Sequence, residues 1–298
     1  MENNKFPTVR FESKKTSKIY DNQVVKVTQY NARPVADVMM VSGFVNNNLK
    51  DYEKINKNEY RNKKTGEIKQ YEHNEFRSEK SDKRSMRQLE KILLNNFSGA
   101  DNELFVTLTT EEEVTDISKM KHNFKKFWDK LKKDYADIEY VYVFEMQQER
   151  ESLHIHVMIK ALSHKKLYIS NTKITEYWGQ GQTQTKRINA KPSFFKIDVE
   201  KEMSGKCKPI EVCNIDKLIS YMCKYNTKEN VPTGVRLYST SRNIKSPSST
   251  IMKYSSFKEE FHQDNSKIID GYTTKIISNN TDETINTILK QRWIKNKQ

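Results

Sequence analysis

The middle of the chain alternates between helical and strand patterns of apolar residues. A helical spacing precedes Gly99 and joins Met86, Leu89, Ile92, Leu93 and Phe97. Strict alternation then predicts a strand over 104–110 (LFVTLTT), and further strands over 140–145, 154–159 and 194–199. Between them we expect a helix capped by Asp116, a short helix over 171–178 capped by Asn171, and a helix over 216–228 that Asn214 or Asp216 opens. This order predicts an α+β fold, an antiparallel sheet with helices on one face and the other face open.

The two ends of the chain are more polar and less periodic. Short strands are predicted over 24–27 and 35–41, and 46–80 has the composition of a solvated arm. The last fifty residues predict an edge strand over 272–277 and a terminal helix over 281–294. We therefore divide the chain into an N-terminal arm or accessory segment (1–80), a central domain (81–250) and a C-terminal extension (251–298).

The charge balance narrows the partners. The 298 residues carry 53 Lys+Arg against 39 Asp+Glu, a formal net charge of +14, and the basic residues divide into 42 lysines and 11 arginines. Such a field attracts polyanions, and lysine suits phosphates better than base reading, so nucleic acid is the expected partner. No apolar run approaches the roughly 18 residues of a membrane span, which argues against an integral membrane protein. Three cysteines, an odd number, favour reduced thiols in a cytosol.

His154 and His156 stand two apart in a predicted strand, so both imidazoles share one sheet face. A hairpin that turns at Arg150 and Glu151 places Glu145 opposite His156 and Gln147 opposite His154, on that same face. Two imidazoles and a carboxylate leave positions open on a divalent ion, a set that favours catalytic Mg²⁺ or Mn²⁺ over structural zinc. A packed, purely structural histidine pair is the alternative.

The predicted helix 216–228 carries two Tyr-x-x-Lys repeats, Tyr221 with Lys224 and Tyr225 with Lys228. A phenol that faces a metal site can attack a phosphodiester, with a neighbouring cation to stabilise the charge that develops. The alternative is an amphipathic helix whose tyrosines only pack.

Taken in order, LFVTLTT, HIHVM and YMCKYNTK resemble the three motifs of the HUH endonucleases that initiate rolling-circle replication. Two further segments resemble the same family: ITEYWGQG (174–181) and the basic RLYSTSRNIKSP (236–247). The resemblance spans about 85–247, roughly half the chain.

This resemblance implies an RRM-like or ferredoxin-like sheet and cleavage of single-stranded DNA through a 5′-phosphotyrosine, which leaves a 3′-OH primer. It implies His154, His156 and Glu145 as metal ligands, with Gln147 as the alternative third ligand because Glu145 lies one residue further from His154 than the pattern expects. It also implies Tyr221 as nucleophile, Tyr225 as a second nucleophile or a neighbour, and Lys224 beside the phosphate. The DNA contacts expected in addition are Thr107, Thr109, Lys228, Arg242 and Lys245.

The expected setting is plasmid or phage DNA in a bacterial cytoplasm. No GxxxxGK[ST] motif occurs, so strand separation and synthesis are expected to need a host helicase and polymerase. An HUH transposase or relaxase is an alternative, although relaxases place the tyrosine near the N-terminus. A non-catalytic RRM-like binder would stack bases on exposed Phe105 and Tyr142. A cupin-type oxygenase is disfavoured by only eight glycines and by Lys160 in place of a carboxylate after His156.

Overall fold

The computed structural model describes residues 9–15, 18–42, 52–56, 58–70, 79–147, 152–163, 166–189, 211–224, 235–261, 265–279 and 281–295. They form two compact units. The terminal unit comprises Met1–Tyr30, Pro34–Asn74 and Ser248–Gln298, and the central unit comprises Asn31–Arg33 and Glu75–Pro247. The strand predicted over 194–199 lies outside the described residues.

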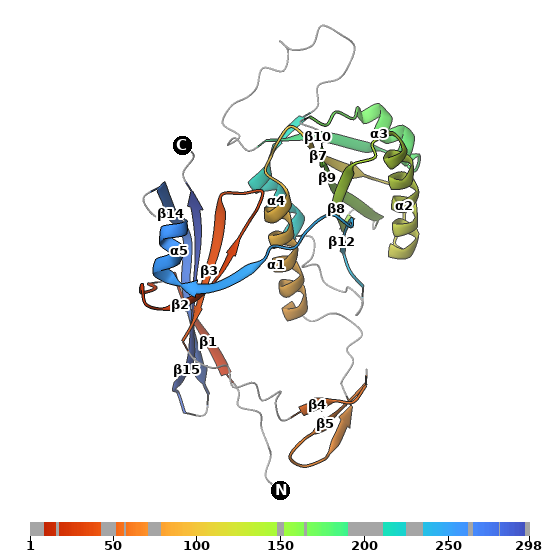
Figure 1. Ribbon diagram of the computed structural model, residues 1–298. Helices are drawn as coiled ribbons and strands as arrows, with labels where there is room; N and C mark the ends of the chain where they lie inside the picture. Colours follow the sequence, from red (N-terminus) through yellow and green to blue (C-terminus); the bar gives the residue numbers. More distant parts are fainter. Residues whose placement is uncertain are drawn as a thin grey trace. The chain divides into compact units, whose positions relative to one another are not determined.

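The central unit is built on a six-stranded sheet of order β11-β10-β7-β9-β8-β12 (Figure 1). Its elements are α1 (Glu79–Asn96), β7 (Glu103–Leu108), α2 (Ile117–Asp134), β8 (Ile138–Gln147), β9 (Ser152–Ala161), α3 (Asn171–Trp178), β10 (Thr183–Asn189), β11 (Glu211–Asn214), α4 (Ile215–Lys224) and β12 (Tyr238–Thr240). The run β7-α2-β8-β9-α3-β10 with spatial order β10-β7-β9-β8 is the ferredoxin-like βαββαβ arrangement. The predicted α+β class with an antiparallel sheet is confirmed; β11 adds one parallel pair beside β10.

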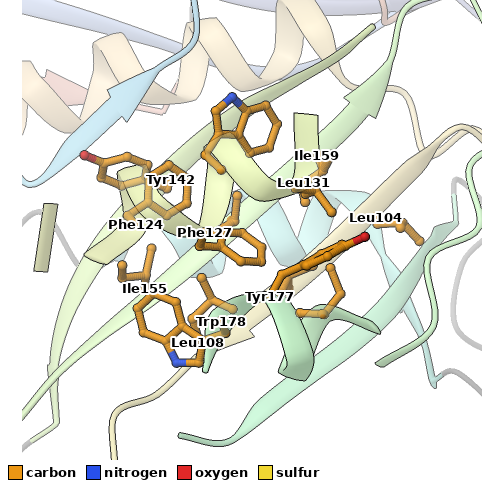
Figure 2. Close-up of a cluster of buried hydrophobic side chains, with 14 of the residues drawn as sticks. Leu104, Leu108, Phe124, Phe127, Leu131, Tyr142, Ile155, Ile159, Tyr177 and Trp178 are labelled. Carbon is orange, nitrogen blue, oxygen red and sulfur yellow. The ribbon is translucent and has the colours of Figure 1, made fainter. Parts of the chain in front are cut away.

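One face of this sheet forms the main core with α2 and α3. The sheet residues Leu104, Leu108, Ile155 and Ile159 are almost completely buried there. Figure 2 shows the aromatic side chains of the two helices packed against these strands. The helical residues that fill the layer are Met120, Phe124, Phe127, Trp128, Leu131, Ile174, Tyr177 and Trp178. Their spacing of three and four along α2 is the reason that this segment is a helix with one apolar side.

Local capping confirms most of the predicted helix ends. The Asp116 carboxylate accepts a hydrogen bond from the backbone N–H of Ser118 at 2.7 Å, as the N-cap of α2. The cap of α3 lies one residue earlier than expected, because Ser170 is its N-cap in place of Asn171. Asn214, one of the two expected openers of α4, accepts hydrogen bonds from the backbone N–H groups of Asp216 and Lys217.

The opposite face of the sheet was expected to be open, but α4 lies on part of it. Tyr221 of α4 packs its ring against Phe105 and His156, which project from that face. The physical reason is the apolar character of the face, where Val143 and Met158 also lie fully buried. α1 packs against α4, and the Cys223 thiol donates to the carbonyl of Met86 at 3.9 Å.

The terminal unit has a second six-stranded sheet, of order β1-β14-β15-β3-β2-β13. Its elements are β1 (Val9–Lys14), β2 (Val24–Gln29), β3 (Val35–Val41), β13 (Ser249–Lys253), α5 (Tyr254–Glu260), β14 (Ser266–Ser278) and β15 (Thr284–Lys295), with a separate three-stranded sheet of β4 (Tyr52–Lys54), β5 (Glu59–Asn62) and β6 (Ile68–Gln70). The N-terminal arm and the C-terminal extension, which the sequence analysis separates, therefore contribute strands to one sheet. The strands predicted over 24–27 and 35–41 are confirmed.

Two predictions for the C-terminal segment are wrong. The helix expected over 281–294 is strand β15, which pairs with β14 on one side and β3 on the other. Burial alternates at Leu289, Gln291 and Trp293, as a strand requires, and pairing on both edges overrides any local helical preference. The strand expected over 272–277 exists as part of β14, but β14 lies inside the sheet because β1 covers its outer edge.

Candidate functional site

The hairpin of β8 and β9 brings Glu145 and the two histidines onto one face of the central sheet. Glu145 is paired with His154, and Val143 with His156. The expected register, with Glu145 opposite His156 and Gln147 opposite His154, is therefore wrong by two residues, and Gln147 instead pairs with Ser152. A shift of two residues preserves the face on which each side chain lies, so the expectation that Glu145 shares the histidine face is correct.

Glu145 reaches His156 diagonally across the hairpin. Its Oε2 lies 2.6 Å from Nε2 of His156. The His156 side chain is only 4% exposed and that of Glu145 18%, so the contact is largely shielded from water. A polar group buried in this way needs a partner, and here each side chain supplies one for the other.

Strand β7 holds the other ring nitrogen of the same histidine. Thr107 pairs with His156 in the ladder, and the Thr107 hydroxyl lies 3.1 Å from Nδ1 of His156. The ring is therefore bound at both nitrogens and has one orientation, with Nε2 directed at Glu145. The sequence analysis expected Thr107 to contact DNA and missed this contact, because only the pairing of β7 with β9 brings the two residues together.

Aromatic rings enclose His156 on two sides. Phe105 of β7 stacks on it, with centroids 5.7 Å apart and an interplanar angle of 10°. Tyr221 of α4 meets it edge-on, with centroids 5.2 Å apart at 74°. Tyr221 stays 39% exposed, so its ring packs at the site while part of the side chain faces solvent. The structure thus brings together the predicted nucleophile, one predicted histidine and the predicted carboxylate.

The position of α4 follows from its amphipathic character. Its apolar side buries Leu218, Ile219 and Met222, and Tyr221 lies at the border of that side. At the start of the helix, Asp216 forms an ion pair with Arg33. Lys224 is the last residue of α4 and is exposed, three residues after Tyr221. Tyr225 and Lys228 lie outside the described residues.

The side chains around His156 have the chemistry that a divalent metal requires. Within the described residues, no group of three or more His, Cys, Asp and Glu side chains is clustered for a metal ion. The chemistry of the residues nevertheless fits one: His156 directs Nε2 at a carboxylate while its other nitrogen is held by a hydroxyl, an arrangement typical of histidine ligands. His154 lies on the same face, directly opposite Glu145, and is partly exposed.

The basic segment after α4 is tied to the edge of the sheet. β12 pairs with β8, the Ser241 hydroxyl accepts from the backbone N–H of Tyr140 at 2.7 Å, and Asn243 donates to the buried carboxylate of Glu139 at 2.8 Å. These ties leave Arg242 exposed in a turn. Sequence reasoning missed the role of Glu139, for which an acidic residue in an otherwise apolar strand was the available signal.

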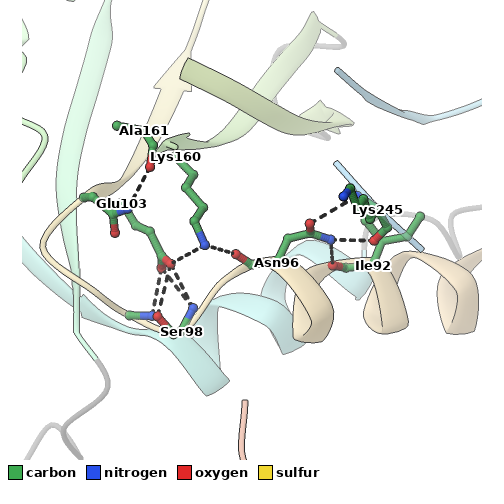
Figure 3. Close-up of polar contacts among 9 residues, drawn as sticks. Ile92, Asn96, Ser98, Glu103, Lys160, Ala161 and Lys245 are labelled. Carbon is green, nitrogen blue, oxygen red and sulfur yellow. Dashed lines mark hydrogen bonds and ion pairs between the residues drawn. The ribbon is translucent and has the colours of Figure 1, made fainter. Parts of the chain in front are cut away.

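Lys245 is held through its backbone. The amide side chains of Asn95 and Asn96, at the end of α1, donate to its carbonyl at 3.0 and 2.8 Å, and the Asn96 side-chain oxygen accepts from its N–H (Figure 3). The side chain of Lys245 is exposed. Figure 3 also shows buried Glu103, which accepts from the backbone N–H of Ser98 at 2.9 Å and orders the turn after α1.

Thr109 and the aromatic residues of the non-catalytic alternative are placed differently from what was expected. The Thr109 hydroxyl donates to the carbonyl of Gln182 at 2.8 Å and so has a structural partner. Phe105 and Tyr142 are each 5% exposed, and Tyr142 lies on the core face against Phe124. Neither ring is an exposed stacking platform, so the expectation on which the non-catalytic binder rests is wrong.

No helix of the described residues is long and apolar enough to cross a membrane. Comparison with curated proteins and with solved structures gave no significant match. A family model described as replication-associated protein, of the ORF2 type, matches residues 103–230. This stretch runs from β7 to the residues just after α4 and contains Thr107, Glu145, His154, His156 and Tyr221. The part of the chain that carries the candidate site is therefore similar to this family of replication-associated proteins.

Proposed function

We propose that the central unit nicks and joins single-stranded DNA during the initiation of rolling-circle replication, with Tyr221 as the nucleophile. The observation that carries this proposal is the contact of the Tyr221 ring with His156, which in turn contacts Glu145 and Thr107. The match to a replication-associated family supports the setting, and the HUH resemblance of the same motifs supports the chemistry.

In the proposed cleavage, the phenolic oxygen of Tyr221 forms a bond to phosphorus, and the bond between phosphorus and the 3′ oxygen of the preceding nucleotide breaks. The phenol loses its proton to solvent, and the departing 3′ oxygen takes up a proton. The products are DNA linked to Tyr221 through its 5′ phosphate and a free 3′-OH that can prime synthesis. Joining is the reverse reaction, in which a 3′-OH displaces Tyr221.

The other side chains position and stabilise the reacting groups. Thr107 and Glu145 hold the His156 ring, and Phe105 packs on its face, so the ring presents a fixed surface to Tyr221. Lys224, exposed at the end of the same helix, supplies positive charge for the phosphate. A divalent ion, Mg²⁺ or Mn²⁺, held by His154, His156 and Glu145, would neutralise charge on the phosphoryl oxygens. Gln147 remains the alternative ligand and Tyr225 the alternative nucleophile.

The DNA is proposed to extend from this centre over exposed basic side chains. Arg242 and Lys245 are held by their backbones at the edge of the sheet, and Lys228 follows α4 in the chain. Thr107 and Thr109 line the strand end beside His156. In the cell, a plasmid or phage origin in a bacterial cytoplasm is the proposed substrate, with a host helicase and polymerase as partners.

The test is a search for a denaturant-stable protein–DNA adduct. Labelled single strands that tile the DNA flanking the coding sequence are incubated with the full chain and Mn²⁺, then resolved under denaturing conditions. We expect an adduct that is lost in Tyr221→Phe, in His156→Ala and in the presence of a chelator. Tyr168→Phe is the matched control, since Tyr168 is exposed in the same unit and does not belong to the site.

Three outcomes would overturn parts of the proposal. Loss of the adduct in Tyr225→Phe alone would transfer the nucleophile to the next turn. Adduct formation that persists in a chelator would remove the metal. Tight binding of every strand with no adduct from any of them would favour a non-catalytic DNA-binding protein. A transposase or relaxase would instead form the adduct on DNA from transposon ends or transfer origins.

A further inference from the structure

The segment ITEYWGQG (174–181) takes no part in the proposed chemistry, yet its backbone geometry is tightly constrained. α3 ends at Trp178, and Gly179 caps it in the left-handed conformation with φ of 59°. At Gly181, φ is 153°, and a Cβ would lie 2.7 Å from both the backbone nitrogen of Glu111 and the carbonyl oxygen of Thr109. Only glycine allows the two loops to approach so closely.

Hydrogen bonds join these two loops into one structure. The backbone N–H of Thr109 donates to the carbonyl of Gln182 at 3.0 Å, and that of Glu111 donates to the carbonyl of Gln180 at 2.8 Å. The indole N–H of Trp178 donates to the carbonyl of Thr109 at 2.5 Å. The loop after β7 is therefore held to the loop before β10 as a continuation of the β7–β10 ladder.

A pocket of about 430 Å³ opens where these loops meet α2 and α3. This volume is within the range of roughly 300–1,000 Å³ typical of small-molecule sites. Polar side chains line it: Glu111, Glu112, Lys119, Asn123, Thr175 and Gln180. The amide groups of Asn123 and Gln180 lie beside each other, with the Asn123 nitrogen 3.5 Å from the Gln180 side-chain oxygen.

The charges of the pocket identify the class of ligand. Glu111 and Glu112 are opposed by Lys119 alone among the lining residues, and the Lys119 ammonium lies 3.4 Å from the Glu112 carboxylate. In a chain of net charge +14, this is a locally acidic site, so a phosphate is disfavoured here. Side-chain amides and carboxylates together suit the edge of a nucleobase, and a carboxylate accepts a hydrogen bond from an exocyclic amino group.

The pocket also lies close to the proposed cleavage centre. Thr107 contacts His156, and Thr110, which lines the pocket, follows three residues later on the same strand end. Three residues of extended chain span about 10 Å, a distance that a short stretch of single strand bridges.

We infer that this pocket holds one unpaired base of the DNA strand beside the scissile phosphate and selects a base with an exocyclic amino group over thymine. The inference rests on the proposed function for its partner, single-stranded DNA. Recognition of a base turned out of the stack by hydrogen bonds to its edge is a general way to read a single strand. The pocket then contributes to the choice of nicking site, while Tyr221 carries out the cleavage.

The test separates base choice from cleavage by measuring binding. The full chain with Tyr221→Phe is incubated with a pool of random single-stranded oligonucleotides, and the bound fraction is sequenced. We expect one position at which thymine is depleted about tenfold, a typical effect of one lost base contact. In Asn123→Ala and Gln180→Ala this depletion disappears while preferences at other positions persist.

Lys126→Ala is the control on the same helix, because Lys126 is exposed and does not line the pocket. It should weaken binding of all sequences alike, as a phosphate contact does, and leave the depletion intact. Gly181→Ala, in which backbone atoms must move, should abolish the depletion together with the loop contact; circular dichroism checks that it folds.

The outcomes distinguish this inference from the proposed function. If single strands bind with the thymine depletion but wild-type protein forms no adduct, the pocket stands and the nickase fails. If the adduct forms but base preferences are the same in wild type, Asn123→Ala and Gln180→Ala, the nickase stands and the pocket inference is wrong. Selection of thymine at the pocket-dependent position would also overturn it.

Discussion

The two units of the chain each have a six-stranded sheet, but they are assembled differently. In the central unit, the βαββαβ run is consecutive in sequence, from β7 to β10, and two helices bury an aromatic core against it. In the terminal unit, strands from opposite ends of the chain pair, as Val9 with Ser278 shows. α5, the helix within the described part of that unit, packs Phe257 against Trp293. A core can thus be built from consecutive elements or from distant ones, and only the first leaves a local signal in the sequence.

The difference also concerns polar residues. The central sheet directs Glu145, His154 and His156 from one face, and a buried histidine there contacts a carboxylate. In the terminal unit, the buried polar groups satisfy one another as structure: the Tyr254 hydroxyl and the Trp293 indole both donate to the Gln291 side-chain oxygen, at 2.6 and 3.0 Å. We conclude that the candidate chemistry belongs to the central unit, and that the terminal unit has a core of its own.

The largest expected effect breaks the comparison at the level of chemistry. Tyr221→Phe should lower adduct formation by about a thousandfold or more, because the hydroxyl is the proposed attacking group. Tyr254→Phe, in the terminal unit, should leave the adduct yield unchanged at a temperature where the protein is folded. Quantified adduct yield on a denaturing gel measures both. Equal loss in the two variants would show that the tyrosines matter only for folding.

A second test compares the two cores. Phe127 and Phe257 are almost fully buried, one in each unit. Replacing either by alanine removes a large apolar side chain and leaves a cavity, at an expected cost of about 3–5 kcal/mol. Hydrogen exchange followed by mass spectrometry should show the loss of protection mainly in strands of the substituted unit. Loss spread evenly over both units would mean that they unfold together.

High pH should weaken both units through buried tyrosines. Burial raises the pKa of Tyr142 in the central unit and of Tyr254 in the terminal unit to about 12, from 10.0. Since the folded state favours the protonated phenol, this stability is complete below pH 10 and is lost as the pH rises through 12. Denaturant unfolding at stepped pH measures the loss. Tyr142→Phe and Tyr254→Phe should each reduce the pH dependence, whereas exposed Tyr168→Phe should not.

The smallest effect concerns ion pairs. In the terminal unit, Arg292 donates to both carboxylate oxygens of Asp37, at 2.6 and 3.0 Å, and both side chains are mostly buried. Asp37→Asn should cost about 1 kcal/mol. In the central unit, Lys125 and Asp129 form an exposed pair on α2, and Asp129→Asn should change stability by less than about 0.5 kcal/mol. Denaturant midpoints compare them, and equal costs would contradict the dependence on burial.

Much of the central unit was predictable because its signals are local. The helical spacing that includes Phe124, Phe127 and Leu131 and the cap at Asp116 need only neighbouring residues, and both are confirmed. The C-terminal strand was not predictable in the same way. Its spacing of apolar residues also fits a helix, and only pairing with β14 and β3 makes a strand the better solution.

The sequence by itself determined which residues share a face, because a strand alternates with a period of two whatever its partners are. His154, His156 and Glu145 were therefore assigned to one face correctly, although their register was wrong by two residues. The tertiary structure alone decided that register, the contact of Thr107 with His156, and the position of Tyr221 over the same ring. It also decided that the two chain ends share a sheet. Such contacts join segments far apart in sequence, and their geometry depends on the packing of the whole core, which no local pattern records.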